Sequence, residues 1–143
     1  MRVPINRALA VLCAALLALG FAACSSTGSI GGFKGEAHAV AQTISNLQAD
    51  ATARDEPKVC ANDLASSVVK RLDLAKGGCK QAIKNQLNEV DTFELTVESV
   101  QVNASGAHPT ASARVKNLQA GKTRLNTVLL VKEAGEWKIS GIR

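Results

Sequence analysis

Aromatic residues are scarce in this chain of 143 residues, which has three Phe, one Trp and no Tyr. The hydrophobic core must therefore be built from Leu, Val, Ile and Ala. The absence of tyrosine also excludes any catalytic mechanism that uses a phenol hydroxyl as its proton donor.

Residues that catalyse reactions or bind metals are equally few. The two histidines, His38 and His108, have no acid or nucleophile at an informative spacing, so we expect both on the surface. The sequence has no Cys-x-x-Cys motif, and no cluster of His and Cys has the spacing of a zinc site. It therefore predicts no catalytic residue, no cofactor and no metal site.

Basic residues exceed acidic ones by five, but no cluster of Lys and Arg is interleaved with aromatic residues. Nucleic-acid binding is therefore not expected. A mildly basic chain can bind anionic lipid or cell-wall polymer weakly, and an ordinary solvated surface explains the same composition.

The N-terminus has the pattern of a secretory signal. Arg2 and Arg7 are the only charged residues before Lys34, and residues 8–23 form an apolar run. This run is too short to span a bilayer, which needs about 20 apolar residues. The segment is therefore expected to direct export.

The apolar run ends in Phe21, Ala22 and Ala23, and Cys24 follows. Small residues before a cysteine resemble a lipobox, in which the cysteine is acylated and becomes the new N-terminus; the usual residue at the place of Phe21 is Leu. We expect removal of residues 1–23 and a lipid on Cys24 that holds the exported protein on the extracytoplasmic side of the cell membrane. Ordinary cleavage near Ala23, which leaves Cys24 as a free thiol, is the alternative.

The remaining chain, residues 24–143, has 120 residues and a net charge of +3 after the loss of Arg2 and Arg7. This length suffices for one domain with a real core. Residues 24–35 are rich in Ser and Gly, a composition typical of a flexible tether. Residues 36–143 are expected to form the domain.

Two cysteines besides Cys24 remain in the mature chain, Cys60 and Cys79. Outside the cytoplasm an even pair indicates a disulfide. The bond would close a loop of about 20 residues, worth roughly 3 kcal/mol on the chain-entropy account. Metal binding is the alternative, but no further His or Cys lies near them in the sequence.

Three helices are expected in the first half of the domain. One helical face over residues 36–54 carries Val40, Ile44, Leu47 and Ala51.

Asn62 or Asp63 is expected to cap a second helix, in which apolar residues recur at every fourth position, Leu64, Val68 and Leu72. Gly77 and Gly78 interrupt the chain, and a third helix is predicted over residues 79–88.

From Asp91 onward apolar residues recur at every second position, which predicts four strands joined by turns. The apolar phase slips by one after Val97, and such a slip predicts a β-bulge that bends the sheet. In the third strand Val128 and Leu130 are expected to face away from the sheet face that packs on the helices, and a second copy of the chain could pack on them. The opposite, inward face would carry Leu125, Thr127, Leu129 and Val131.

The expected fold class is α+β, with three N-terminal helices packed on a bent four-stranded antiparallel meander sheet in a cone-like roll. The element order and the ending with Gly135, Trp137 and Ile139 at alternate positions resemble small secreted proteins of the nuclear-transport-factor-two-like superfamily. Many exported actinobacterial lipoproteins of this type look similar, with a lipobox and a cysteine pair around the second and third helices. The resemblance implies a cone-shaped domain enclosing a pocket.

These observations favour a membrane-tethered, non-catalytic binding or interaction module of the cell envelope. Its partner would be a small apolar ligand in the cone, an envelope protein on the sheet, or a second copy of the chain. Arg114 and Lys116 share one strand face and Arg124 and Lys132 share another, and together they could form a basic stripe that receives an anionic partner; solubility and edge protection explain the same charges. Trp137 is expected in the core, and stacking on a ligand at the mouth of the cone is the alternative.

Two alternatives remain open. A small isomerase or dehydratase would need a titratable group in the cone, and Glu98 would be its base if the bulge turned it inward. A purely structural accessory lipoprotein would need no ligand at all.

Overall fold

The computed structural model describes residues 30–119 and 121–143. The predicted signal, the acylation site Cys24 and residues 24–29 of the predicted tether lie outside these residues, and residues 30–35 of the tether form a 3-10 turn and lead into the first helix. Within them, no helix combines the length and the hydropathy that a bilayer crossing needs.

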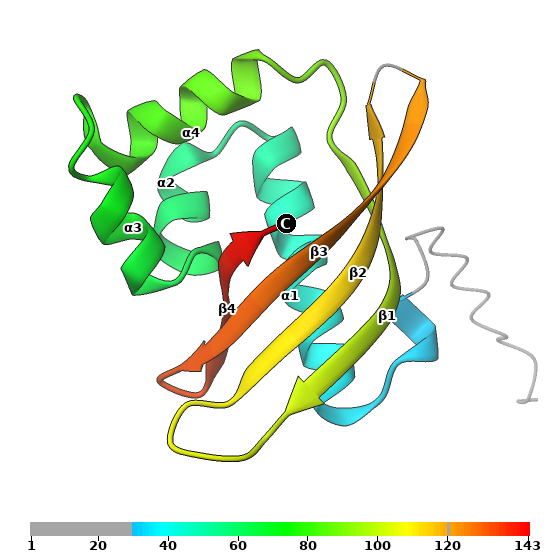
Figure 1. The fold of residues 1–143 in the computed structure, drawn as a ribbon. Helices are drawn as coiled ribbons and strands as arrows, with labels where there is room; N and C mark the ends of the chain where they lie inside the picture. Colours follow the sequence, from blue (N-terminus) through cyan, green and yellow to red (C-terminus); the bar gives the residue numbers. More distant parts are fainter. Residues whose placement is uncertain (1–29, 120) are drawn as a thin grey trace, which may run out of the picture.

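The described chain is a helical half followed by a sheet (Figure 1). A 3-10 turn, η1 (Ile30–Gly32), precedes four helices and one π-helical turn: α1 (Gly35–Thr52), α2 (Glu56–Lys58), η2 (Val59–Asp63), α3 (Ser66–Leu72) and α4 (Gly78–Asn88). The strands are β1 (Glu94–Asn103), β2 (Thr110–Gln119), β3 (Lys122–Glu133) and β4 (Glu136–Ile142).

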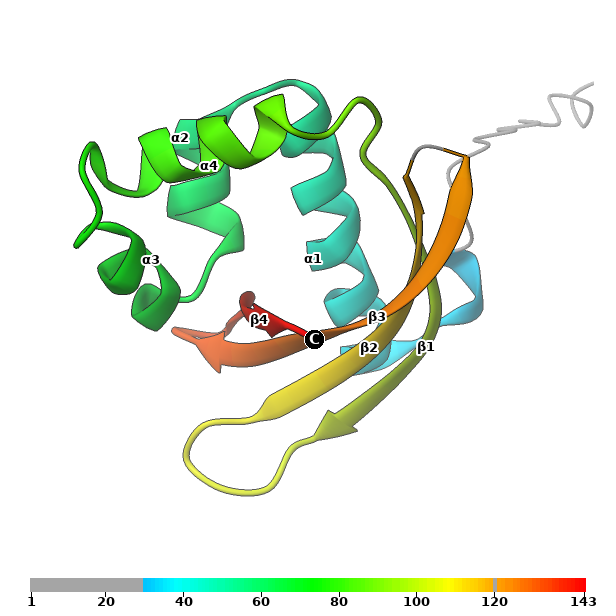
Figure 2. The same cartoon turned by 45° about the horizontal axis from the view of Figure 1, so that its top comes forward.

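The four strands form one antiparallel sheet in the order β1-β2-β3-β4, and the helices lie on one of its faces (Figure 2). The predicted α+β class with helices on a curved meander sheet is thereby confirmed. The predicted bulge is present between Val97 and Ser99, and a second irregularity lies between Leu129 and Leu130. Bulges add local twist, which bends the sheet around the helices.

Helix α1 is the main cover of the sheet, as its apolar spacing predicts. Its buried residues recur every three or four positions and include Val40, Ile44 and Leu47. They pack in one cluster with Val128, Leu130 and other residues of the sheet. Removing these apolar side chains from water stabilises the fold, at about 25 cal/mol per Å² of apolar area buried.

The inward face of β3 differs from the expectation. Val128 and Leu130 are each only 1% exposed and belong to the core, whereas Leu125 is 54% exposed. Directly opposed residues share a face, and Val128 pairs with the buried Ala113 while Leu125 pairs with Lys116. A second copy therefore cannot pack on Val128 and Leu130.

The predicted second helix is divided. Leu64 is extended and forms a parallel bridge with Ile139 of β4, and the Ala65 N–H donates to the Ile139 carbonyl at 2.8 Å. Asp63 is not a helix cap, because it ends the π-helical turn and its side chain is buried. Pairing with the edge of β4 replaces the helical hydrogen bonds that the sequence pattern predicted.

The disulfide between Cys60 and Cys79 is confirmed, with Cα atoms 6.2 Å apart. It joins the π-helical turn to the first turn of α4, where the Cys79 N–H donates to the Asp73 carboxylate at 2.9 Å. Structural disulfides indicate an oxidising compartment.

Replacing both Cys60 and Cys79 with Ala should lower the free energy of unfolding by about 3 kcal/mol, because the unfolded chain regains the entropy of a 20-residue loop. Urea denaturation followed through the fluorescence of the single Trp measures this loss. Cys24→Ser is the matched control and should leave the midpoint unchanged. Equal stability of the wild type with and without reductant would contradict the assignment.

Candidate functional site

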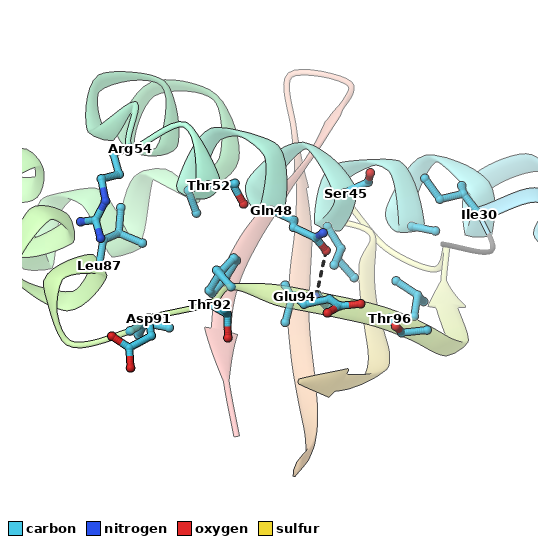
Figure 3. Close-up of a pocket in the computed structure, with 17 residues that line it drawn as sticks. Ile30, Ser45, Gln48, Thr52, Arg54, Leu87, Asp91, Thr92, Glu94 and Thr96 are labelled. Atoms are coloured by element: carbon cyan, nitrogen blue, oxygen red, sulfur yellow. Dashed lines mark hydrogen bonds between the residues drawn. The ribbon is translucent and has the colours of Figure 1, made fainter. Parts of the chain in front are cut away.

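A groove of about 560 Å³ lies between α1 and the edge strand β1 (Figure 3). The segment from Leu87 of α4 to Phe93 lines one end, and Ile30 lies at the other end beside Thr96. Its volume is in the range of roughly 300–1,000 Å³ that small-molecule sites have.

Helix α1 forms one wall of the groove and presents two neighbouring stripes to it, one apolar and one polar. Ala41 and Ile44 are buried and provide apolar floor. Ser45, Gln48 and Thr52, at spacings of three and four residues, lie one above another on the adjacent stripe. The groove thus has an apolar floor and a wall of uncharged polar groups.

Strand β1 forms the opposite wall. Among the described residues it pairs with β2 alone, so its other edge carries backbone groups without a strand partner there. The Gln48 side chain reaches across the groove, and its Oε1 accepts a hydrogen bond of 2.9 Å from the Leu95 N–H. This bond ties α1 to β1 and leaves the Gln48 amide group inside the groove (Figure 3).

Charged residues line the groove at the end near α4. Arg54 donates to the Asn88 Oδ1 at 2.9 Å, and Asp91 and Glu94 are also on the lining. This end therefore offers one fixed cation and the Asp91 carboxylate to a polar group of a ligand, and Glu94 lies midway along the groove, below Gln48 (Figure 3).

The sequence analysis missed this groove. Ser45, Gln48 and Thr52 form a polar stripe directly beside the apolar face of α1, which is the signal that could have indicated it. The signal is weak, because solvent-exposed stripes of helices have the same composition.

The structure does not bring Trp137 to the groove. The indole is 4% exposed in the core, and its Nε1 donates to the Glu36 carboxylate at 2.7 Å. The Lys132 ammonium donates to the same carboxylate at 2.7 Å and lies 5.6 Å from the indole ring centre. Hydrogen bonds from Lys132 and then Trp137 lower the pKa of Glu36.

Arg114 and Lys116 lie on the outer face of the sheet, away from the groove, and both are exposed. Lys116 pairs with Glu98 at 2.6 Å, so the bulge leaves Glu98 outside the cone instead of turning it inward. The predicted basic stripe is divided between two faces, because Lys132 lies on the helix side against Glu36.

Both histidines are exposed, His38 in the first half of α1 and His108 in the turn between β1 and β2. Neither residue is on the groove lining.

Asp63 is the buried acid of the described residues. It is 2% exposed, and its Oδ2 has no hydrogen-bond partner. Burial, with a smaller contribution from the nearby Asp50 charge, raises the pKa of Asp63 to about 6, against the opposing effect of Lys138. The residue lies outside the groove lining.

No protein-family model matches the chain, and no curated protein matches it. Nine chains of solved structures do, including a designed protein named Rd1NTF2_05 that carries five substitutions. It is 17% identical, with a TM-score of 0.46 over 72% of this chain and 93% of its own. A likeness this weak carries no argument about family or function, so membership of the superfamily stays a prediction.

Asp63→Asn should stabilise the protein at pH 7 and remove part of its pH dependence. A folded pKa raised from 3.8 to about 6 gives a stabilising contribution that is complete below pH 4 and is lost as the pH rises through 6. Unfolding free energies of wild type and variant should therefore differ by about 2 kcal/mol more at pH 7.5 than at pH 4, where the carboxyl of the unfolded chain is already partly ionised.

Carboxylates with lowered pKa values, Glu36 and Glu133, change stability in the opposite direction on acidification. Their contributions to stability are the same in the wild type and in Asp63→Asn, so they cancel in the difference between the two unfolding free energies. A difference that does not change between pH 4 and pH 7.5 would show that Asp63 titrates normally.

Proposed function

We propose that the protein is a membrane-tethered lipoprotein of the cell envelope whose domain binds a small apolar ligand in the groove between α1 and β1. The groove carries this proposal: it has the size of a ligand site and an apolar floor. Its uncharged polar wall can fix the orientation of a ligand through single hydrogen bonds.

The sequence and the disulfide support the tether. A signal-like segment followed by small residues precedes Cys24, and acylation leaves Cys60 and Cys79 as the pair that the structure joins. A bond of this kind is typical of exported proteins.

The arrangement of titratable groups favours binding over catalysis. Asp63, whose pKa is shifted toward neutrality, is separated from the groove, and Glu98 is engaged outside with Lys116. An isomerase or dehydratase would have to work with Asp91 or Glu94 at the rim, where water competes for the proton. A purely structural lipoprotein would leave the groove without an occupant.

Filling the groove should abolish binding of an uncharged apolar dye. Ser45→Phe places a ring over the floor formed by Ala41 and Ile44, and we expect it to weaken Nile red binding about tenfold or more. Fluorescence titration of the purified domain measures the dissociation constant.

Ala49→Phe is the matched control, because Ala49 is exposed and absent from the groove lining of the same helix. It should bind the dye as the wild type does. Equal weakening by both variants, or no saturable binding by the wild type, would contradict an apolar ligand site in the groove.

The tether has a separate test. Mass spectrometry of the protein extracted from host membranes should show an N-terminal Cys24 that carries acyl chains, and Cys24→Ser should move the protein to the soluble fraction. An unmodified Cys24, or cleavage at another position, would remove the anchor from the proposal.

A further inference from the structure

The positive charge of the mature chain is concentrated in one hairpin. No acidic residue lies between Glu98 and Glu133, a stretch that contains five basic residues, Arg114, Lys116, Lys122, Arg124 and Lys132. Since residues 24–143 have a net charge of +3, the other parts of the mature chain together carry −2. The hairpin of β2 and β3 is thus the basic pole of the molecule.

The end of this hairpin also exposes large apolar side chains. We define the hairpin tip as residues 116–118 and 122–125. Leu118 and Leu125 in this tip are 40% and 54% exposed, and both belong to the outer face, since Leu125 pairs with Lys116 and Leu118 pairs with Thr123. Residues 122–125 are all exposed, so the sheet is covered on neither face there.

The tip contains cations that no described acid neutralises within ion-pair distance. Lys116 pairs with Glu98, but Lys122 and Arg124 form no salt bridge among the described residues. Arg124 pairs with Asn117 and alternates with Leu125 along β3, so the two cations lie on the face of the hairpin opposite the two leucines, and the tip has one apolar and one cationic face. This combination is typical of segments that lie at the surface of an anionic bilayer.

The place where the chain enters the domain brings the tip within reach of the proposed anchor. Ile30 lies beside Thr96 in the groove, and Thr96 pairs with Lys116 at the base of the tip (Figure 3). Cys24 is six residues before Ile30, so that their Cα atoms are separated by at most about 22 Å. From Lys116 to Leu118 the strand advances about 7 Å toward Glu94 and away from Ile30, a distance that the six residues between Cys24 and Ile30 can span.

We propose that the hairpin tip is a second membrane contact, in which Leu118 and Leu125 enter the headgroup region of an anionic bilayer while Lys122 and Arg124 bind lipid phosphates. The proposal rests on the proposed lipid anchor for its geometry. An anionic polymer would also attract the cations, but binding to a polymer would not explain why two leucines are exposed on the opposite face of the same tip. The bilayer accounts for both observations.

The test uses the mature chain, residues 24–143, with Cys24→Ser, so that only the domain's own affinity is measured. Sedimentation with vesicles of phosphatidylglycerol and phosphatidylcholine should show binding that vesicles of pure phosphatidylcholine do not support. Lys122→Gln with Arg124→Gln should weaken partitioning about 25-fold, at about fivefold for each cation. Leu118→Ser with Leu125→Ser should weaken it at least tenfold at unchanged net charge.

Lys70→Gln with Arg71→Gln is the matched control, because it removes the same charge from exposed positions of α3. It should retain at least half of the binding. A fluorophore on Leu125→Cys should shift to the blue on the vesicles, and one on Leu74→Cys, at a position 89% exposed in the loop after α3, should not.

The outcomes separate this proposal from the anchor. Loss of binding in the control and in the tip variants alike would overturn the tip contact and indicate general electrostatic attraction. Unchanged binding in the leucine variant, with equal binding to a soluble polyanion, would overturn it in favour of a polymer. No vesicle binding by the Cys24→Ser chain, with acylated Cys24 in the wild type, would overturn the tip contact and leave the anchor in place.

Discussion

The packing of α1 on the inner face of the sheet is the contact on which the other features depend. One stripe of the helix, with Val40 and Ile44, completes the core, and the next stripe, with Ser45 and Gln48, stands over the edge of β1. Because a helix turns by about 100° per residue, one rigid element supplies both surfaces. Any shift of α1 that loosened the core would therefore also change the width of the groove.

The start of α1 is held by a polar cluster on the two last strands. The Glu36 carboxylate accepts from Trp137 and from Lys132, and Lys132 also lies near the indole ring. The buried indole N–H would lack a partner without this carboxylate, and an unsatisfied buried donor costs about 1–3 kcal/mol. At the opposite end of the helix Gln48 bonds to Leu95, so α1 is attached to both edges of the sheet.

Much of the fold was predictable from local patterns, since the helix period, the strand period and the phase slip at Val97 each depend on neighbouring residues alone. The side of β3 that faces inward was not predictable, because Leu125 and Leu130 are equally apolar and a strand with two apolar faces has no intrinsic inside. The register with the small residues of β2 decides it, and that register is a long-range property. The extended Leu64 likewise depends on the distant Ile139, and the groove depends on two elements about 50 residues apart in the sequence, as the bond between Gln48 and Leu95 shows.

Ile30 connects the groove to the predicted tether that carries Cys24. It lines the groove and is also the first described residue of the predicted tether, so the proposed lipid on Cys24 is only six residues along the chain from one end of the groove. A ligand that is poorly soluble in water would then pass from the bilayer into the groove near this end. The basic hairpin extends toward the other end of the groove, because Leu118 pairs with Glu94 and Lys116 pairs with Thr96. The proposed anchor and the proposed contact at the hairpin tip would thus lie near opposite ends of the groove. A domain held at both would lie with the groove along the bilayer, which is an arrangement expected if the ligand comes from the membrane.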